Sequence, residues 1–331
     1  LLEKFLYRIK SNLNKTGLKA EIFIGGSFAK KTLIKKGVYD IDIFIRFDES
    51  YEDDKLSNLT KKLIHNFQDI IILHGSRDYF RIRLNDNIFV EIVPVRKTQK
   101  PGDAKNITDF SYMHVKYINR KIKKEKVLNE TLLAKAFCHA NNCYGAESYI
   151  RGFSGYALEL LIIHYKSFLN FIKAMTQVKD KLIIDIEKLH KNKNAVLMDL
   201  NSSKLQSPII LIDPTYKQRN VLAALSYETF EKFKKVCLDF IKNPSINSFE
   251  HKKIDIEKIK KTAINNDNEF ILVEASTDKQ SGDIAGSKLL KFYNHLREEV
   301  NLFFEIKKQD FDYNKDKTAK YSFVVRKKKE I

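Results

Sequence analysis

The segment 40–46 constrains the fold most, because it alternates strictly: residues 41, 43 and 45 are all isoleucine, while residues 40 and 42 are aspartate. This two-residue period predicts a β-strand whose isoleucines face the core and whose aspartates project together from the other face. Two neighbouring carboxylates repel each other unless a divalent cation lies between them, and hard oxygen ligands favour magnesium. The alternative is a solvated acidic pair on an edge strand.

A third carboxylate and a glycine turn extend this pattern. Glu91 lies in the apolar run 89–93, where a charge on an interior strand is costly unless it is paired or ligated. The alternative is that Glu91 faces water while its neighbours pack. The Gly-Gly-Ser sequence at 25–27 follows a short strand and precedes a short helix, so its N–H groups can hold an anion, although such a turn is also common as a plain connection. Lys30 lies where it can neutralise a phosphate.

Composition favours a soluble protein with a polyanionic partner. The 331 residues carry 60 Lys and Arg against 42 Asp and Glu, a formal net charge of +18, which favours nucleic acid and, second, a membrane surface. The three cysteines, Cys138, Cys143 and Cys237, have no CxxC spacing and fit a reducing cytoplasm better than a disulfide framework or a zinc site. No apolar run approaches the ~20 residues that cross a bilayer, and no secretory signal opens the chain, so we expect no membrane association.

The hydrophobic periodicity divides the chain into three regions. Residues 1–126 alternate helices and strands, including strands at 77–84 and 88–94 joined by a turn. Residues 127–245 are dominated by the helical period, which extends over 181–190 and 217–241. Residues 246–331 return to a mixture of helices and strands. We therefore expect an α+β protein in which a helical middle domain separates a mixed-sheet domain from a small α+β domain.

The order of these motifs resembles a known superfamily. The Gly-Gly-Ser turn, the strand with Asp40 and Asp42, and Glu91 on a later strand are similar to the nucleotidyltransferase superfamily of DNA polymerase β type. Within it, the chain resembles the archaeal class I CCA-adding enzymes, which are tRNA nucleotidyltransferases. The motifs that carry this closer resemblance are Tyr144-Gly-Ala-Glu, Arg151-Gly-Phe-Ser-Gly-Tyr, Glu159-Leu-Leu, Asp213-Pro and Arg219-Asn-Val.

The resemblance implies a fold and an activity. It predicts a polymerase β-like nucleotidyltransferase palm at 1–126, a helical nucleotide- and tRNA-binding domain at 127–245, and a shortened RNA-binding domain at 246–331. The implied reaction is the template-independent addition of CCA to the 3′ end of tRNA from CTP and ATP, in which the RNA 3′-hydroxyl attacks the α-phosphate and pyrophosphate leaves. It takes place in the cytoplasm, and a homodimer is left open.

The resemblance also implies site residues. Asp40, Asp42 and Glu91 are the catalytic residues and the ligands of two Mg²⁺ ions. The nucleotide site consists of Gly26, Ser27, Lys30, Ser111, His114, Lys135, Tyr144 and Arg219.

Several of these residues also have plainer interpretations. His114 can be a surface histidine on a polar helix, Lys135 can extend past an apolar face to water, and Tyr144 and Tyr156 can be core or domain-interface aromatics.

The sequence departs from the family pattern at several positions. Glu91 replaces the more usual aspartate, Lys30 the more usual arginine, and Ser111 the more usual threonine, while Phe110 stands where the family has arginine. The chain is also shorter than the family norm, mostly at its C-terminal end. These departures leave alternatives open: a partial CC- or A-adding enzyme, a poly(A)-type polymerase, a nucleotidyltransferase for small molecules or proteins, and, from another class, a non-catalytic RNA-binding protein.

Overall fold

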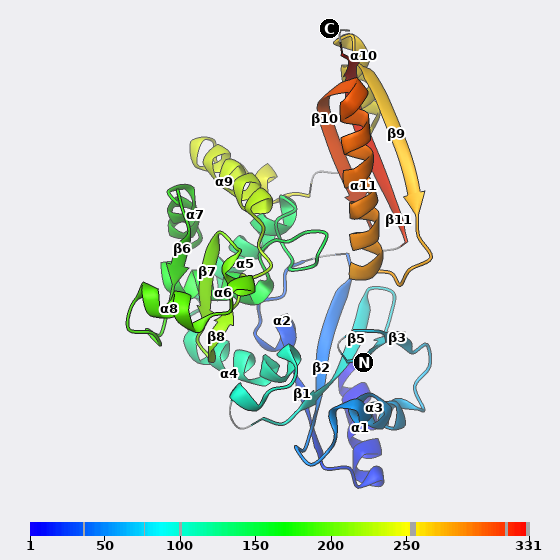
Figure 1. Ribbon diagram of the computed structural model, residues 1–331. Helices are drawn as coiled ribbons and strands as arrows, with labels where there is room; N and C mark the ends of the chain where they lie inside the picture. The colour runs from blue at the N-terminus through cyan, green and yellow to red at the C-terminus, as the bar shows by residue number, and fades with distance from the viewer. Residues whose placement is uncertain (36, 76, 99–100, 252–255, 315–316, 329–331) are drawn as a thin grey trace.

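Three sheets succeed one another along the chain, each with its own helices and apolar core, in this computed structural model (Figure 1). The structure describes residues 1–331 with the exception of 36, 76, 99–100, 252–255, 315–316 and 329–331. Within this described part, none of the helices has the length and apolar character needed to cross a bilayer.

The first sheet has the strand order β1-β2-β5-β4-β3, in which β2 and β5 are parallel and the other neighbours are antiparallel. Its strands are β1 (Ala20–Ile24), β2 (Tyr39–Phe47), β3 (Ile71–Leu73), β4 (Tyr79–Arg83) and β5 (Ile88–Arg96). Helices α1 (Leu2–Thr16) and α3 (Leu56–Ile64) cover one face, where Ile9 packs with Ile41, Ile43 and Ile45. The strand period predicted for 40–46 is therefore confirmed, and Asp40 and Asp42 lie on the opposite face.

The middle region is mostly helical but also contains a three-stranded sheet. Its helices are α4 (Ser111–Lys121), α5 (Glu125–Ala140), α6 (Gly155–Tyr165), α7 (Phe168–Thr176), α8 (Lys193–Asp199) and α9 (Tyr227–Lys242), and its strands are β6 (Leu182–Ile184), β7 (Ile209–Asp213) and β8 (Tyr216–Asn220). The helical prediction for 181–190 and for the start of 217–241 is wrong. All five residues of β7 are buried, because Ile209 and Leu211 pack on one side and Ile210 and Ile212 on the other. A strand buried on both faces loses the two-residue period by which a strand is recognised.

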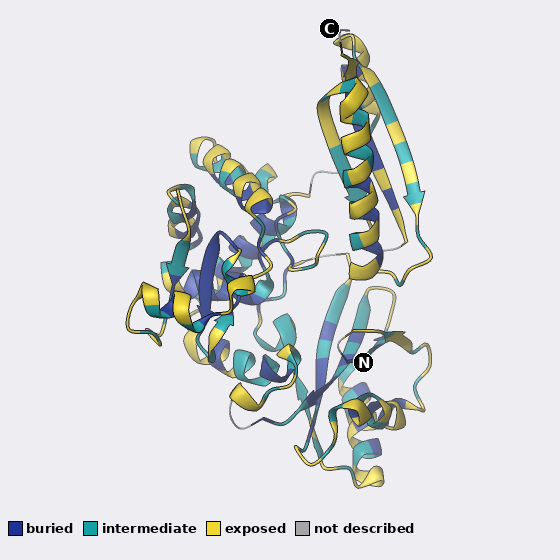
Figure 2. Ribbon diagram, viewed as in Figure 1, coloured by how far each residue is buried: buried dark blue, intermediate teal, exposed yellow. Residues whose placement is uncertain are grey.

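The third region is a three-stranded antiparallel sheet, β10-β11-β9, covered by one long helix. Its elements are α10 (Ile256–Asn265), β9 (Glu269–Ser276), α11 (Asp283–Phe303), β10 (Phe304–Tyr313) and β11 (Thr318–Lys327). The mixture of helices and strands predicted for 246–331 is confirmed here. Figure 2 shows that α11 turns its exposed side outwards along most of its length, whereas β7 in the middle region is dark throughout.

The segment that leads into α11 joins the third region to the other two. Asp283 accepts hydrogen bonds from the backbone N–H and the hydroxyl of Ser148 at 2.7 and 3.1 Å. Gln280 exchanges two hydrogen bonds with the backbone of His74, beside β3. The third region therefore contacts both the first sheet and the middle region.

Candidate active site

The three predicted carboxylates lie on the same face of two neighbouring parallel strands. In the register of β2 and β5, Asp42 is the partner of Glu91, and Asp40 is the partner of Phe89. Residues two apart on a strand share a face, so the alternation seen in the sequence places all three acidic side chains away from the core. The pairing of β2 with β5 supplies what the sequence alone could not, because it brings position 91 beside position 42.

The glycine turn is fitted against Asp42. The Gly25 N–H donates to the Asp42 carbonyl oxygen at 2.8 Å, which joins the turn to β2. Gly26 has φ +58°, and a Cβ at this position would lie 1.6 Å from Asp42 Oδ2. Glycine is therefore required twice here, once for its left-handed backbone and once for the space that the carboxylate occupies. Ser27 follows in the four-residue helix α2 (Gly26–Ala29).

Asp42 lies in an environment that disfavours its negative charge. Burial, together with the nearby charge of Asp40, raises the pKa of Asp42 to about 6, and Lys30 acts in the opposite direction. A carboxylate that is desolvated next to a second carboxylate gains from any additional cation. The electrostatics of the site thus call for positive charge beyond that of Lys30.

A buried ionic cluster holds the two predicted nucleotide-binding lysines. Glu159, in α6, accepts hydrogen bonds from Lys30 Nζ at 2.6 Å, from Lys135 Nζ at 2.7 Å and from the Thr32 hydroxyl at 2.6 Å. Lys135 also donates to the Thr32 carbonyl oxygen at 3.1 Å and is 1% exposed. Lys135 does not extend to water, therefore, but belongs to a cluster that ties α5 and α6 to the segment after α2.

A second cluster surrounds Asp213, at the end of β7. Asp213 Oδ2 lies 2.9 Å from His114 Nε2 and accepts a hydrogen bond from Arg219 at 2.6 Å, while Oδ1 accepts from the Tyr156 hydroxyl at 3.1 Å. The rings of His114 and Tyr156 are stacked with centroids 4.0 Å apart. Burial lowers the pKa of His114, an effect that Asp213 opposes, and His114 is a largely enclosed residue instead of a surface histidine.

The first turn of α6 connects both clusters. The Tyr156 ring faces Lys30 at 5.7 Å and Arg219 at 6.0 Å, in addition to its stacking on His114. A Cβ on Gly155 would lie 2.8 Å from the Tyr144 hydroxyl and 3.4 Å from Lys135 Nζ.

Tyr144 lies at the same end of α6, because its hydroxyl is the nearest neighbour of a Cβ on Gly155. Burial raises the pKa of Tyr144, and the charges of Glu159 and Asp42 add to the effect. Most of the predicted nucleotide residues therefore gather around one helix end beside Asp42. Ser111 lies three residues before His114 on α4, hence on the same side of that helix.

Comparison with known proteins agrees with this arrangement. Residues 2–132 match the family model of the nucleotidyltransferase domain, and residues 129–250 match that of the second domain of tRNA nucleotidyltransferase. The CCA-adding enzyme of Nanoarchaeum equitans is 42% identical over 220 residues, which are 66% of this chain and 54% of that protein. The chain is therefore similar in sequence to the archaeal CCA-adding enzymes.

Further relatives support the same conclusion. The CCA-adding enzyme of Thermococcus gammatolerans is 31% identical over 255 residues, which are 75% of this chain and 55% of that protein. The chain thus spans about half the length of these curated relatives. Among solved structures, a cytoplasmic RNA terminal U-transferase superposes with a TM-score of 0.57 at 12% identity, over 76% of this chain and 92% of that one. At this identity the likeness concerns the fold alone, and it confirms the predicted α+β nucleotidyltransferase fold.

Nucleotidyltransferases generally use divalent metal ions, and the donor chemistry of this site fits them. The three side chains offer only hard carboxylate oxygens. The three side chains do not form a preformed metal-binding site in this structure. Among the described residues, no group of three His, Cys, Asp or Glu is placed to hold a metal ion. Arg81 lies among these carboxylates, where it donates to Asp40 at 2.7 Å and lies 3.9 Å from Glu91. A guanidinium thus supplies part of the positive charge that the carboxylates need.

Three important residues of the site were not predicted as site residues: Arg81, Glu159 and Asp213. For Glu159 the sequence does contain a signal, because it is the only acidic residue in the apolar helix 155–165, where a charge must have a partner. Asp213 similarly ends a fully apolar strand. Tyr156 is a buried core aromatic, as one interpretation of the sequence has it, and its hydroxyl and ring also contact Asp213 and His114.

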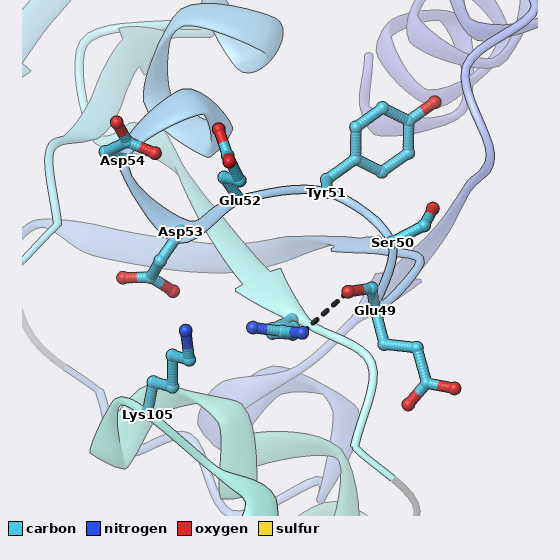
Figure 3. Close-up of a pocket in the computed structure, with 8 residues that line it drawn as sticks. Glu49, Ser50, Tyr51, Glu52, Asp53, Asp54 and Lys105 are labelled. Atoms are coloured by element: carbon cyan, nitrogen blue, oxygen red, sulfur yellow. Dashed lines mark hydrogen bonds between the residues drawn. The ribbon is translucent and has the colours of Figure 1, made fainter.

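A hollow elsewhere in the first region is separate from this site. It measures about 500 Å³ and is lined by residues 49–54 with Arg96 and Lys105, beyond the end of β2 that is distant from Asp40. Figure 3 shows Asp53 and Lys105 facing each other across it. Asp53 also pairs with Arg77, which is buried against Asp109. One wall of this hollow therefore belongs to an ion-pair network that stabilises the fold.

Proposed function

We propose that this chain is a template-independent tRNA nucleotidyltransferase that builds CCA at the tRNA 3′ end from CTP and ATP. The observation that carries the proposal is the convergence on the first turn of α6. There the ring of Tyr156 lies between Lys30, which neighbours Asp42, and the pair of His114 and Arg219. A group of carboxylates suited to phosphoryl chemistry and a polar cluster suited to a base thus lie next to each other.

Asp40, Asp42 and Glu91 would hold two Mg²⁺ ions. When bound, such ions lower the pKa of the attacking hydroxyl and neutralise the triphosphate. Asp42 is well suited as a ligand, because its burial beside Asp40 makes a cation the most effective way to keep it ionised.

The residues around the glycine turn would receive the triphosphate. Lys30 is held by Glu159 at 2.6 Å, so its ammonium is fixed in direction next to Asp42. Lys135 donates to the same carboxylate, and the Tyr144 hydroxyl lies near Gly155 beside it. Ser27 belongs to the turn itself. A positively charged group that needs no reorganisation stabilises a phosphate more effectively than a mobile surface lysine.

Arg219 and His114 would face the base. Asp213 fixes both side chains by charge-assisted hydrogen bonds of 2.6 and 2.9 Å, which makes their donor positions specific. Phe110 stacks on Tyr216 at 5.1 Å and on His114 at 6.1 Å, and so packs against the Asp213 cluster. We place the tRNA along the basic surface of the chain, whose net charge of +18 suits contacts with phosphates.

The test is an extension assay on the full chain with tRNA that lacks its terminal CCA, magnesium, and CTP, ATP or both. We expect two additions with CTP and a third only when ATP is present. Asp42→Ala should abolish every addition while its tRNA affinity, measured by filter binding, stays near that of the parent. Addition of C alone or A alone would indicate the partial enzyme, and runs of A would indicate a poly(A)-type polymerase. Retention of activity in Asp42→Ala would refute the proposal.

A further inference from the structure

The carboxylate site contains a cation of its own. Arg81, on β4, is the register partner of Glu91 on β5, which in turn is the partner of Asp42 on β2. The three strands therefore carry Arg81, Glu91 and Asp42 across one row of the sheet. From this row the Arg81 side chain extends to Asp40, with Nη2 2.7 Å from Asp40 Oδ1 and Nε 3.9 Å from Glu91 Oε1.

We propose that Arg81 is an intrinsic competitor of the divalent metal. In this view its guanidinium balances Asp40 and Glu91 while no metal is bound, and it must leave Asp40 before an ion can use that carboxylate. The inference rests on the proposed function in one respect, that these carboxylates bind metal. Arg81 is then a positioning residue, which sets how tightly the site takes a free ion.

Two features of Arg81 would allow a metal ion to displace its guanidinium from Asp40 reversibly. Its ion pair with Asp40 is accessible to water, since the two side chains are 30% and 43% exposed, and pairs of this kind are weak. Its Nε is buried without a hydrogen bond among the described residues, so the guanidinium is only partly satisfied where it lies.

A second anchor keeps the side chain nearby. The guanidinium lies over the Phe89 ring at 4.0 Å, and Phe89 is the strand partner of Asp40. Stacking on an aromatic face does not depend on the carboxylates, so Arg81 can release Asp40 and stay on the ring. The exchange therefore needs only a rotation of the guanidinium away from Asp40.

This competition would favour the ion that arrives with a nucleotide. A free ion must displace Arg81 using the three carboxylates alone, and it meets a positive charge as it approaches. An ion already bound to a triphosphate brings negative oxygens that lessen this repulsion. Arg81 would thereby discourage metal binding by the enzyme without its substrate.

The experiment measures Mn²⁺ binding to the full chain without nucleotide, by the loss of the electron paramagnetic resonance signal of free Mn²⁺. Arg81→Gln should lower the Mn²⁺ dissociation constant about two- to fivefold, the range expected when a partly exposed ion pair no longer competes. The matched control is Arg83→Gln, which removes the same charge two residues along β4, where Arg83 pairs with Asp86. Arg83→Gln should leave the constant unchanged.

The outcomes separate this inference from the proposed function. Affinity in Arg81→Gln equal to or weaker than that of the parent would overturn the inference. Absence of Mn²⁺ binding in both the parent and Arg81→Gln, or undiminished binding in Asp42→Asn, would instead overturn the metal site and with it the proposed function.

If Arg81→Gln fails to fold, the guanidinium signal of Arg81 can be followed in the parent by ¹⁵N nuclear magnetic resonance. Saturating Mg²⁺ should shift this signal as Asp40 is released, and an unmoved signal would overturn the inference equally.

Discussion

Replacing Glu159 by glutamine should destabilise the protein more than any other single isosteric change near the site. Glu159 is completely buried and accepts from two lysines and one hydroxyl at 2.6 to 2.7 Å. The amide keeps the shape but removes the charge, so that Lys30 and Lys135 remain enclosed without the carboxylate that they share. Breaking a buried pair in this way costs about 3–5 kcal/mol of unfolding free energy.

The pH dependence of this effect has a definite sign. Burial acts to raise the pKa of Glu159, but Lys30 and Lys135 outweigh it and lower the pKa from 4.5 to about 2. A carboxyl with a lowered pKa stabilises the fold fully above its unfolded value, and this contribution is lost as the pH falls through the folded value. The difference between parent and Glu159→Gln should thus be complete at neutral pH and shrink below about pH 4.5.

Urea denaturation at pH 7.5 and at pH 3.5, followed by far-ultraviolet circular dichroism, measures both effects. The matched control is Glu231→Gln on α9, whose partner Lys234 lies at the same distance of 2.6 Å but whose side chain is 63% exposed. The control should unfold like the parent. A loss below about 1 kcal/mol in Glu159→Gln, the size typical of a surface pair, would refute the reasoning that the cluster is a buried ionic one.

Three further predictions concern the neighbours of this cluster. Gly26→Ala should reduce nucleotide addition at least about a hundredfold, since the new methyl group displaces Asp42. The left-handed backbone should also lower the melting temperature by a few degrees. Normal activity would contradict the close fit. Asp213→Asn should loosen Arg219 and His114, which hydrogen-bond to the Asp213 carboxylate. KM for the nucleotide should rise roughly ten- to hundredfold, which corresponds to the free energy of a hydrogen bond to a charged group. An unchanged KM would show that Asp213 has no part in nucleotide binding. Because burial and Asp40 raise the pKa of Asp42 to about 6, its ionised form destabilises the metal-free fold above that pH. Asp42→Asn should therefore melt about 2–4 °C higher than the parent at pH 8 in chelator, and at the same temperature as the parent near pH 4. If the variant melted higher by the same amount at both pH values, the raised pKa of Asp42 would be refuted.

The carboxylate face was predictable because its signal is local. Alternation over seven residues fixes which side chains of β2 share a face, and no long-range contact is needed to place Asp40 beside Asp42. Glu91 was predictable for a related reason, since a charge in an apolar strand must find a partner or water. The sequence could not say that the partner strand lies parallel and in a register that sets Glu91 beside Asp42.

The ionic clusters were not predictable in the same way, because their members are far apart in the chain. Lys30 and Glu159 are separated by 129 residues, and His114 and Asp213 by 99. Helical periodicity placed Lys135 on α5 but gave no information about which residue would face it. The same limit explains β7, whose identity as a strand depends on being covered from both sides.

These long separations have a consequence for how the site is built. Lys30 belongs to the first region, yet Glu159 and Tyr156, which fix its ammonium, belong to the middle one. Likewise, His114 on α4 relies on Asp213 from β7, which lies 99 residues further along the chain. Residues 1–126 alone would present the carboxylates and the glycine turn but would leave Lys30 without its anchor. The site is therefore a property of the contact between the two regions, and the first turn of α6 is where that contact is made.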